Sequence, residues 1–237
     1  MQRKLKNSAM KRVAFVGPSG SGKTELTQAV ASVLQKKSTK TAVIRQDSYY
    51  LGKKRMPEYL AAQNNFDHPA GIEWELLKRH VYCLQAETVY VPVYDFGIHE
   101  RSETESKIVE PPDVLLLEGH LLLSEGDPHL TELMEIMDLV VYVDATPDEC
   151  LARRLERDIK PERGCRRPED ILQQWRSTVA PMHARYVAKN KSLADIRVNN
   201  GKSMEQLLAL AKFFAGGILD LPARNASIEL FDNAASL

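Results

Sequence analysis

An eight-residue segment near the start of the chain has the residue types and spacing that bind phosphate. It matches the pattern G-x-x-x-x-G-K-[ST], in which glycines let backbone N–H groups turn toward an anion. The helix that follows adds the positive end of its dipole. The segment consists of Gly17, Pro18, Ser19, Gly20, Ser21, Gly22, Lys23 and Thr24. We therefore expect Lys23 to contact the outer phosphates of a nucleoside triphosphate, and Thr24 to offer its hydroxyl to Mg²⁺.

Two carboxylates come at the ends of apolar segments further along the chain. Asp47 follows the predicted strand 40–46, where it can accept the proton of a hydroxyl that attacks the terminal phosphate. A turn or helix-cap aspartate is an equally good reading of Asp47 taken alone. Glu118 ends the apolar run 114–118, the usual form of the second carboxylate of a nucleotide site, and is expected to hold Mg²⁺. The alternative for Glu118 is an exposed residue at a strand end.

Arginine is concentrated between residues 153 and 167. Pro161, Gly164 and Pro168 interrupt this stretch, so its middle cannot be one straight helix. The pattern favours a lid, over about residues 154–168, that closes on a triphosphate, excludes water and adds positive charge. The alternative is a solvated basic helix end. The arginines are Arg153, Arg154, Arg157, Arg163, Arg166 and Arg167.

Aromatic residues recur in the extended segment 89–96. Tyr90, Tyr94 and Phe96 are expected to share one face of a strand, and such a face can stack on a nucleobase. His99 could then hydrogen-bond the edge of the base. Ordinary packing of a half-buried strand is the alternative, and it would be preferred for this segment alone.

Strand and helix patterns alternate along the chain and would position these residues. Expected strands are 11–16, 40–46, 114–118, 139–144 and 194–199, and expected helices are 24–36, 73–86, 147–158, 168–190 and 203–214. This order predicts an α/β fold of the P-loop NTPase class, with a mostly parallel sheet between two helical layers. Ligands then bind beyond the carboxyl ends of the strands. One domain is expected over 11–216, between a disordered tail at 1–10 and a C-terminal tail at 217–237 that is disordered over much of 223–237.

The whole chain narrows the classes of protein further. Its 237 residues carry no net charge, which argues against nucleic acid as the main partner. The three cysteines are widely spaced, which suggests a reducing compartment. No apolar run approaches the length of a membrane span, and residues 1–10 lack an apolar signal core. A cytoplasmic protein with no membrane partner is expected.

Several stretches in this order resemble the uridine–cytidine kinase family, over about 11–214. Besides the phosphate-binding segment they are Gln46-Asp47-Ser48-Tyr49-Tyr50, Asn65-Phe66-Asp67-His68-Pro69, Val91-Pro92-Val93-Tyr94-Asp95-Phe96 with His99, Leu117-Glu118-Gly119, and Arg153-Arg154 with Arg157-Asp158. The resemblance implies a nucleoside kinase-like fold with a small β-hairpin flap over the substrate. It also implies transfer of the γ-phosphoryl group of ATP or GTP, with Mg²⁺, to the 5′-hydroxyl of uridine or cytidine. Members of the family are often tetramers.

The resemblance also implies roles for single residues. Asp47 is similar to the family's general base, and Asp67 with Arg154 to its ribose clamp. Tyr94 and His99 are similar to its pair that recognises the base. Further nucleoside contacts are implied for Tyr50, Arg166 and Gln174, and contacts with the triphosphate for Lys23, Arg157 and Arg163.

The chain departs from the family pattern at three places, and these concern the acceptor more than the reaction. Cys165 separates Gly164 from Arg166 in a slightly longer lid, so the lid roles of Arg163 and Arg166 stay interchangeable. His120 stands where an aliphatic residue is usual, and no acidic residue follows Pro69 directly. A kinase of another small alcohol, like phosphoribulokinase, pantothenate kinase or glycerate kinase, is therefore the main alternative. A nucleotide-gated regulatory protein is a second one.

Overall fold

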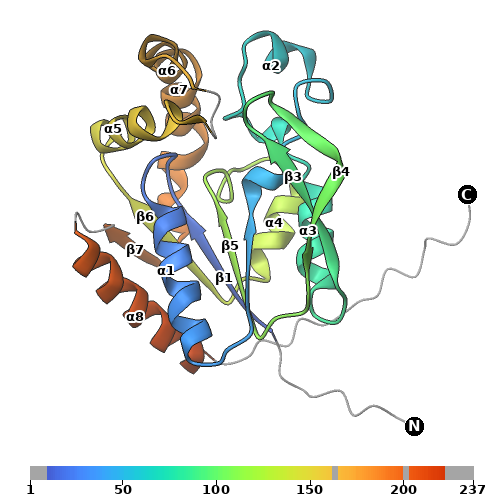
Figure 1. Ribbon diagram of the computed structural model, residues 1–237, viewed down its shortest axis with the longest axis vertical. Helices are drawn as coiled ribbons and strands as arrows, with labels where there is room; N and C mark the ends of the chain where they lie inside the picture. The colour runs from blue at the N-terminus through green and yellow to red at the C-terminus, as the bar shows by residue number, and fades with distance from the viewer. Residues whose placement is uncertain (1–9, 162–164, 200–202, 222–237) are drawn as a thin grey trace, which may run out of the picture.

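The central sheet has five parallel strands in the order β2-β5-β1-β6-β7 (Figure 1). The structure is a computed structural model that describes residues 10–161, 165–199 and 203–221. The strands are β1 (Lys11–Val16), β2 (Thr41–Arg45), β5 (Val114–Gly119), β6 (Leu139–Asp144) and β7 (Ile196–Asn199). The predicted mostly parallel sheet is confirmed, and β1 and β6 have the predicted bounds.

Helices cover both faces of the sheet because its central strands are apolar on both sides. In β1, Val13 and Phe15 belong to one buried cluster, whereas Ala14 and Val16 belong to another. The first cluster includes residues of α1 (Lys23–Lys36) and α8 (Met204–Asp220), and the second residues of α3 (Trp74–Cys83) and α4 (Pro128–Glu135). The predicted three-layer arrangement is therefore confirmed (Figure 1).

A capping box starts α5 (Pro147–Asp158). The Thr146 hydroxyl accepts a hydrogen bond from the Glu149 N–H at 3.3 Å, and the Glu149 carboxylate accepts one from the Thr146 N–H at 3.0 Å. The cap fixes the first residue of the helix. It thereby sets which face presents Arg154 and Arg157, three residues apart, to the carboxyl end of the sheet.

Two helical segments differ from their predicted form. The segment after the lid is α6 (Pro168–Gln174), and it continues to Leu193 through wider π turns, the short α7 (Ala180–Met182) and a 3₁₀ end. Pro181 lies in this run and has no N–H to donate, which accounts for an irregular ladder there. The predicted end of α8 at residue 214 is wrong, because buried Ile218 extends its apolar stripe. The expected domain limit at 216 thus falls inside this helix.

The predicted flap is a two-stranded antiparallel hairpin, separate from the central sheet. It comprises β3 (Val89–Asp95) and β4 (Glu100–Val109), and the short α2 (Glu58–Ala62) lies at the same end of the molecule (Figure 1). The register shifts between Pro92 and Tyr94, which reverses the alternation of faces. Tyr90 is therefore 62% exposed while Tyr94 is buried, and the expectation that they share a face is wrong.

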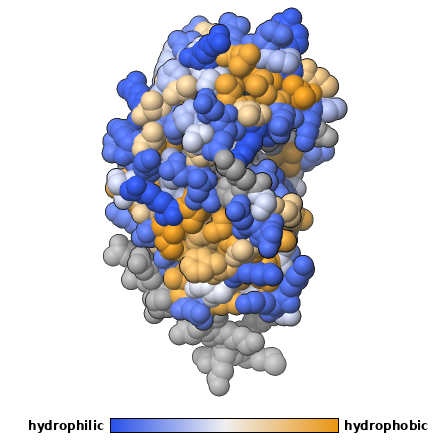
Figure 2. All heavy atoms as spheres, turned by 90° about the vertical axis from the view of Figure 1, so that its left-hand side faces the viewer, coloured by the Kyte–Doolittle hydropathy of each residue, from blue (hydrophilic) through white to orange (hydrophobic). Residues whose placement is uncertain are grey.

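The outer side of α8 carries exposed apolar side chains, namely Met204, Leu208 and Phe213. Figure 2 shows apolar side chains gathered in the lower half of the face on which α8 lies. None of the helices in the described ranges is both long and apolar enough to span a bilayer.

Candidate active site

A cleft of about 290 Å³ lies at the carboxyl ends of the sheet strands, between the hairpin and the helices that follow β6. It brings together residues that are far apart in the sequence. Of the predicted site residues, it is lined by Ser19, Lys23, Thr24, Asp47, Tyr50, Asp67, Tyr94, His99, Glu118, Arg154, Arg157, Arg166 and Gln174. The other loop residues, Gly17, Pro18, Gly20, Ser21 and Gly22, are not among the lining residues. Arg163 lies outside the described residues.

The loop between β1 and α1 has the backbone geometry of a phosphate cradle. Gly20 has φ +90° and Gly22 has φ +86°, a left-handed conformation that glycine adopts at little cost. A Cβ atom on Gly20 would lie 2.5 Å from the carbonyl oxygen of Cys150, so only glycine fits against α5 there. From α5, Arg153 Nη1 donates to the carbonyl oxygens of Ser21, at 2.9 Å, and Gly20, at 3.3 Å. No pattern in the sequence distinguishes Arg153 from the neighbouring arginines for this role.

The candidate metal ligands meet at the base of the loop. The Thr24 hydroxyl donates to Glu118 Oε2 at 2.8 Å, and Arg45 Nε lies 3.3 Å from the other carboxylate oxygen. Glu118 is 5% exposed, so the exposed-residue alternative is wrong. Burial raises the pKa of Glu118, and Lys23 opposes this increase.

A hydroxyl and a carboxylate oxygen fit Mg²⁺, which usually takes one or two protein oxygens and completes its shell with phosphates and water. Within the described ranges, no group of three or more His, Cys, Asp or Glu side chains could hold a metal ion. A magnesium ion at Thr24 and Glu118 would therefore need phosphate and water as its other ligands.

Asp47 has the access that a general base needs. It lies in the 3₁₀ turn Gln46–Tyr49, directly after β2, and its side chain is 39% exposed within the cleft lining. The ring nitrogen Nδ1 of His120 is 4.0 Å from its carboxylate, too far for a hydrogen bond. Its carboxylate can therefore accept a proton from a bound ligand.

Aromatic rings form the wall of the cleft nearest the hairpin. His99 stacks on Phe66 with ring centroids 4.5 Å apart and planes at 16°, and Tyr50 lies 5.2 Å from Tyr94. The Tyr94 hydroxyl is buried without a hydrogen-bond partner among the described residues. Burial lowers the pKa of His99, so its neutral ring can both donate and accept. Phe66 lies within a quoted motif, but its pairing with His99 depends on folding and was not predicted.

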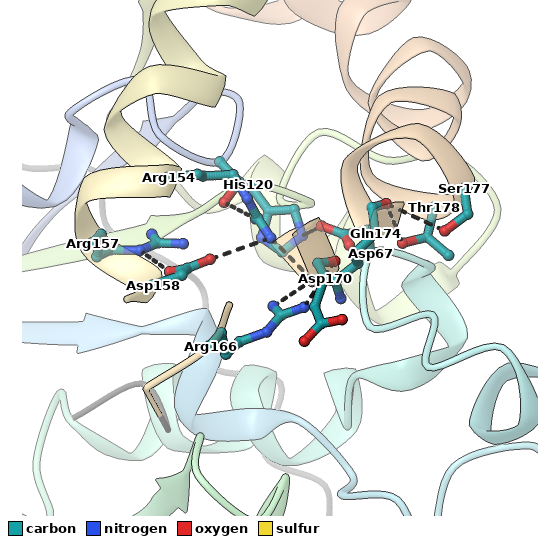
Figure 3. A network of polar contacts seen from close by, with 11 residues as sticks. Asp67, His120, Arg154, Arg157, Asp158, Arg166, Asp170, Gln174, Ser177 and Thr178 are labelled. Carbon is teal, nitrogen blue, oxygen red and sulfur yellow. Dashed lines mark hydrogen bonds and ion pairs between the residues drawn. The ribbon is translucent and has the colours of Figure 1, made fainter. Parts of the chain in front are cut away.

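Arginines from the lid region close the opposite side of the cleft (Figure 3). Arg154 donates to the Ser19 hydroxyl at 2.8 Å and lies 3.5 Å from the carboxylate of Asp158. The Gln174 side-chain oxygen accepts from Arg166 at 2.6 Å and from Arg154 at 3.4 Å. Gln174 thus joins α5 to the segment after the lid.

The remaining lid arginine, Arg157, donates to Asp158 at 2.7 Å and also lines the cleft. This bond raises the pKa of Arg157 against the opposing effect of burial. The guanidinium is therefore a fixed positive charge in the lining of the cleft.

Fold and site together define a P-loop kinase that phosphorylates a small alcohol: a phosphate cradle, an accessible carboxylate and a basic cover share one cleft. The chain belongs to the phosphoribulokinase/uridine kinase family, whose model matches residues 13–206. Membership implies a nucleotide phosphoryl donor and, typically, Mg²⁺.

Individual proteins agree with this membership. A protein named uridine kinase from Bacillus cytotoxicus is 39% identical over 190 residues, which cover 80% of this chain and 85% of that protein. The structure of a "possible uridine kinase" from Bacillus stearothermophilus matches with a TM-score of 0.56 and 16% identity, over 83% of this chain and 92% of that one. D-glycerate 3-kinase from Cryptococcus neoformans matches with a TM-score of 0.54 and 16% identity, over 75% and 79%. These two structures share the fold.

Proposed function

We propose that the protein transfers the γ-phosphoryl group of ATP or GTP to the 5′-hydroxyl of uridine or cytidine. The observation that carries this proposal is the composition of the cleft, which is lined by aromatic rings, by residues of the phosphate loop and by the carboxylates of Asp47 and Asp67. The 39% identity to proteins named uridine kinase supports the same substrate.

In this reaction the protein mainly aligns the 5′-hydroxyl of the nucleoside with the γ-phosphate of the donor, and it forms no covalent bond itself. Asp47 accepts the proton of the 5′-hydroxyl as that oxygen attacks the γ-phosphorus. Lys23 and Arg157 place positive charge beside the phosphate oxygens, where negative charge is stabilised more strongly in a dry cleft than in water. Thr24 and Glu118 would hold Mg²⁺, which offsets further phosphate charge.

The other residues of the cleft hold the nucleoside. Asp67 accepts from the sugar hydroxyls and Arg154 donates to them, while Tyr94 and His99 contact the base. Arg166 and Gln174 complete the pocket when the lid region closes, which excludes water from the reaction. In this proposal Tyr50 lies under the sugar and holds Tyr94 in place.

The aromatic wall also separates this proposal from the kinase of another small alcohol. A sugar phosphate or an organic acid calls for cationic side chains where Tyr94, Phe66 and Phe96 lie. A stacked base gains from the same three rings.

A coupled assay of ADP release over a panel of acceptors tests the proposal. The panel holds uridine, cytidine, adenosine, guanosine, ribulose 5-phosphate, pantothenate and glycerate. Phosphorylation of uridine or cytidine, with the product identified as the 5′-monophosphate, is the expected result. Turnover confined to a sugar phosphate or an acid would refute it.

A further inference from the structure

His120 lies at the floor of the cleft between the two carboxylates that the proposed function needs. It comes one residue after the end of β5 and is 7% exposed. Its Nδ1 atom is 4.0 Å from Asp47, and its Nε2 atom is 3.6 Å from Asp67. The two ring nitrogens therefore face the two carboxylates, and the one that carries a hydrogen decides which carboxylate the ring can donate to.

The main chain determines which ring nitrogen carries this hydrogen. The N–H of Leu121 donates to Gln46 Oε1 at 2.9 Å, which fixes the orientation of the Gln46 amide. Gln46 Nε2 then faces His120 Nδ1 at 3.4 Å, and an amide nitrogen can only donate. Nδ1 is therefore the acceptor, and the ring hydrogen is on Nε2.

Gly119 allows this arrangement. A Cβ atom at Gly119 would lie 2.4 Å from Gln46 Oε1 and 2.6 Å from Gln46 Cβ. Gln46 is fully buried against this glycine, so its amide has no room to turn away. The orientation of His120 is thus fixed by residues of β5 and of the turn after β2.

The Nε2–H group of His120 points at Asp67. It has no hydrogen-bond partner among the described residues, and Asp67 Oδ1 is 3.6 Å away (Figure 3). Of the Lys, Arg and His side chains in the described ranges, His120 alone comes within 4.0 Å of that carboxylate. Asp67 is itself 7% exposed, and a buried carboxylate needs a donor to offset its lost hydration. A slight movement of either side chain brings the pair to hydrogen-bonding distance.

We propose that His120 is a positioning residue that holds the Asp67 carboxylate for the hydroxyls of the ribose, and so sets the preference for ribonucleosides over deoxynucleosides. The inference rests on the proposed function. One lone pair of Asp67 Oδ1 takes the His120 N–H, and the remaining lone pairs accept from the sugar. The relay runs from Leu121 through Gln46 and His120 to Asp67.

The test compares three substitutions at His120, with the better of uridine and cytidine as acceptor and its 2′-deoxy and 3′-deoxy analogues. His120→Ile removes the donor, His120→Gln puts an amide nitrogen near the place of Nε2, and His120→Asn puts it near the place of Nδ1. We expect the Ile and Asn variants to raise the KM of the ribonucleoside about tenfold, with the KM of ATP and of at least one deoxy analogue unchanged. His120→Gln should restore most of the ribose preference.

His80→Gln is the matched control. His80 is a half-buried histidine whose Nδ1 atom is hydrogen-bonded to the Tyr49 hydroxyl at 2.9 Å, and it does not line the cleft. The His80→Gln substitution should lower the melting temperature of the protein and leave its preference for ribonucleosides at the wild-type value. Equal losses on ribose and deoxy acceptors in His120→Ile, no loss at all, or equal rescue by Asn and Gln would each overturn the inference. A wild-type enzyme that phosphorylates no pyrimidine nucleoside would instead refute the proposed function, and the inference with it.

Discussion

At the scale of single residues, Asp47 and Tyr94 have different roles in the proposed function. Asp47 offers an accessible carboxylate directly after β2, and the buried ring of Tyr94 belongs to the acceptor wall. One residue is expected to govern turnover and the other the binding of one substrate. Separate kinetic signatures should therefore follow from substitutions at these two positions.

Asp47→Asn should lower kcat by about 10²–10⁴-fold, because the amide cannot take the proton of the attacking hydroxyl. Affinity for ATP, measured by calorimetry, should stay at the wild-type value. Asp113→Asn is a matched control, since Asp113 precedes β5 at the opposite end of the sheet and accepts from the Lys40 N–H. Wild-type turnover in Asp47→Asn would remove this residue from the mechanism.

Tyr94→Ala should raise the KM of the nucleoside about tenfold, because a ring that contacts the base is lost. The KM of ATP should change much less. Steady-state kinetics with each substrate varied in turn gives both values. An equal effect on the two substrates would place Tyr94 outside the acceptor pocket. Tyr90→Ala serves as the control, since Tyr90 points to solvent from the same strand.

At the scale of elements, the sequence predicted the sheet well and the hairpin poorly. Continuous apolar runs marked β1, β5 and β6, because strands buried on both faces need them. The second hairpin strand, β4, is mostly exposed and charged, so no pattern marked it, and the flap was implied by the family resemblance without its bounds. The bulge that turns Tyr90 away from Tyr94 follows from pairing with β4, which no local pattern encodes.

The same limit applies to the candidate site. The phosphate loop and its following helix form a local motif, so Lys23 and Thr24 could be identified directly. The support that Arg153 gives to the loop joins residues more than 130 positions apart. Contacts of this kind depend on how α5 packs against the loop, whereas the sequence alone shows only a cluster of arginines.

Gly20→Ala should weaken ATP binding at least about tenfold, because the new methyl group would strike the Cys150 carbonyl and the backbone has φ +90°. Gly126→Ala is the control: its φ is +101°, but nothing lies within 4 Å of a Cβ placed there. The control should lose stability through backbone strain alone and keep its affinity for ATP. Calorimetric titration of both variants decides between a general effect of strain and a specific effect on the loop.

Gly216→Ala should stabilise α8 by about 0.5–1 kcal/mol, since glycine in a helix interior costs conformational entropy and no atom of the described residues lies within 4 Å of the new methyl group. Chemical denaturation measures the change. A loss of stability would show that the end of α8 beyond residue 214 is not helical in solution.

At the scale of the whole molecule, acid should destabilise the fold through histidines whose pKa is lowered by their partial or full burial. Burial lowers the pKa of His80 to about 4, from about 6.5 in the unfolded chain, with Arg79 adding to the effect and Glu73 opposing it. Between these values the unfolded chain binds a proton that the folded chain does not. The free energy of unfolding should therefore fall as pH decreases from 6.5 to 4, by up to about 1.4 kcal/mol per pH unit for each such histidine. His80→Gln should flatten this slope in urea denaturation, whereas an unchanged slope would contradict the assignment.

The assembly state is a further property of the whole molecule, and we propose a homo-tetramer by analogy with the family. Light scattering during size-exclusion chromatography should give four times the mass of one chain. The mass of a single chain at micromolar concentration would contradict the proposal, and the cleft would then have to work without a second subunit.

The hairpin shares no strand pairing with the central sheet, although it supplies much of the acceptor wall. Replacing the hairpin segment by that of a relative leaves the strand pairing of the central sheet unchanged. Residues 89–109 are therefore a natural cassette for transplantation between relatives. A chimera could acquire a new acceptor while it keeps the donor machinery of its parent, which makes this segment the natural place to diversify a library for altered nucleoside use.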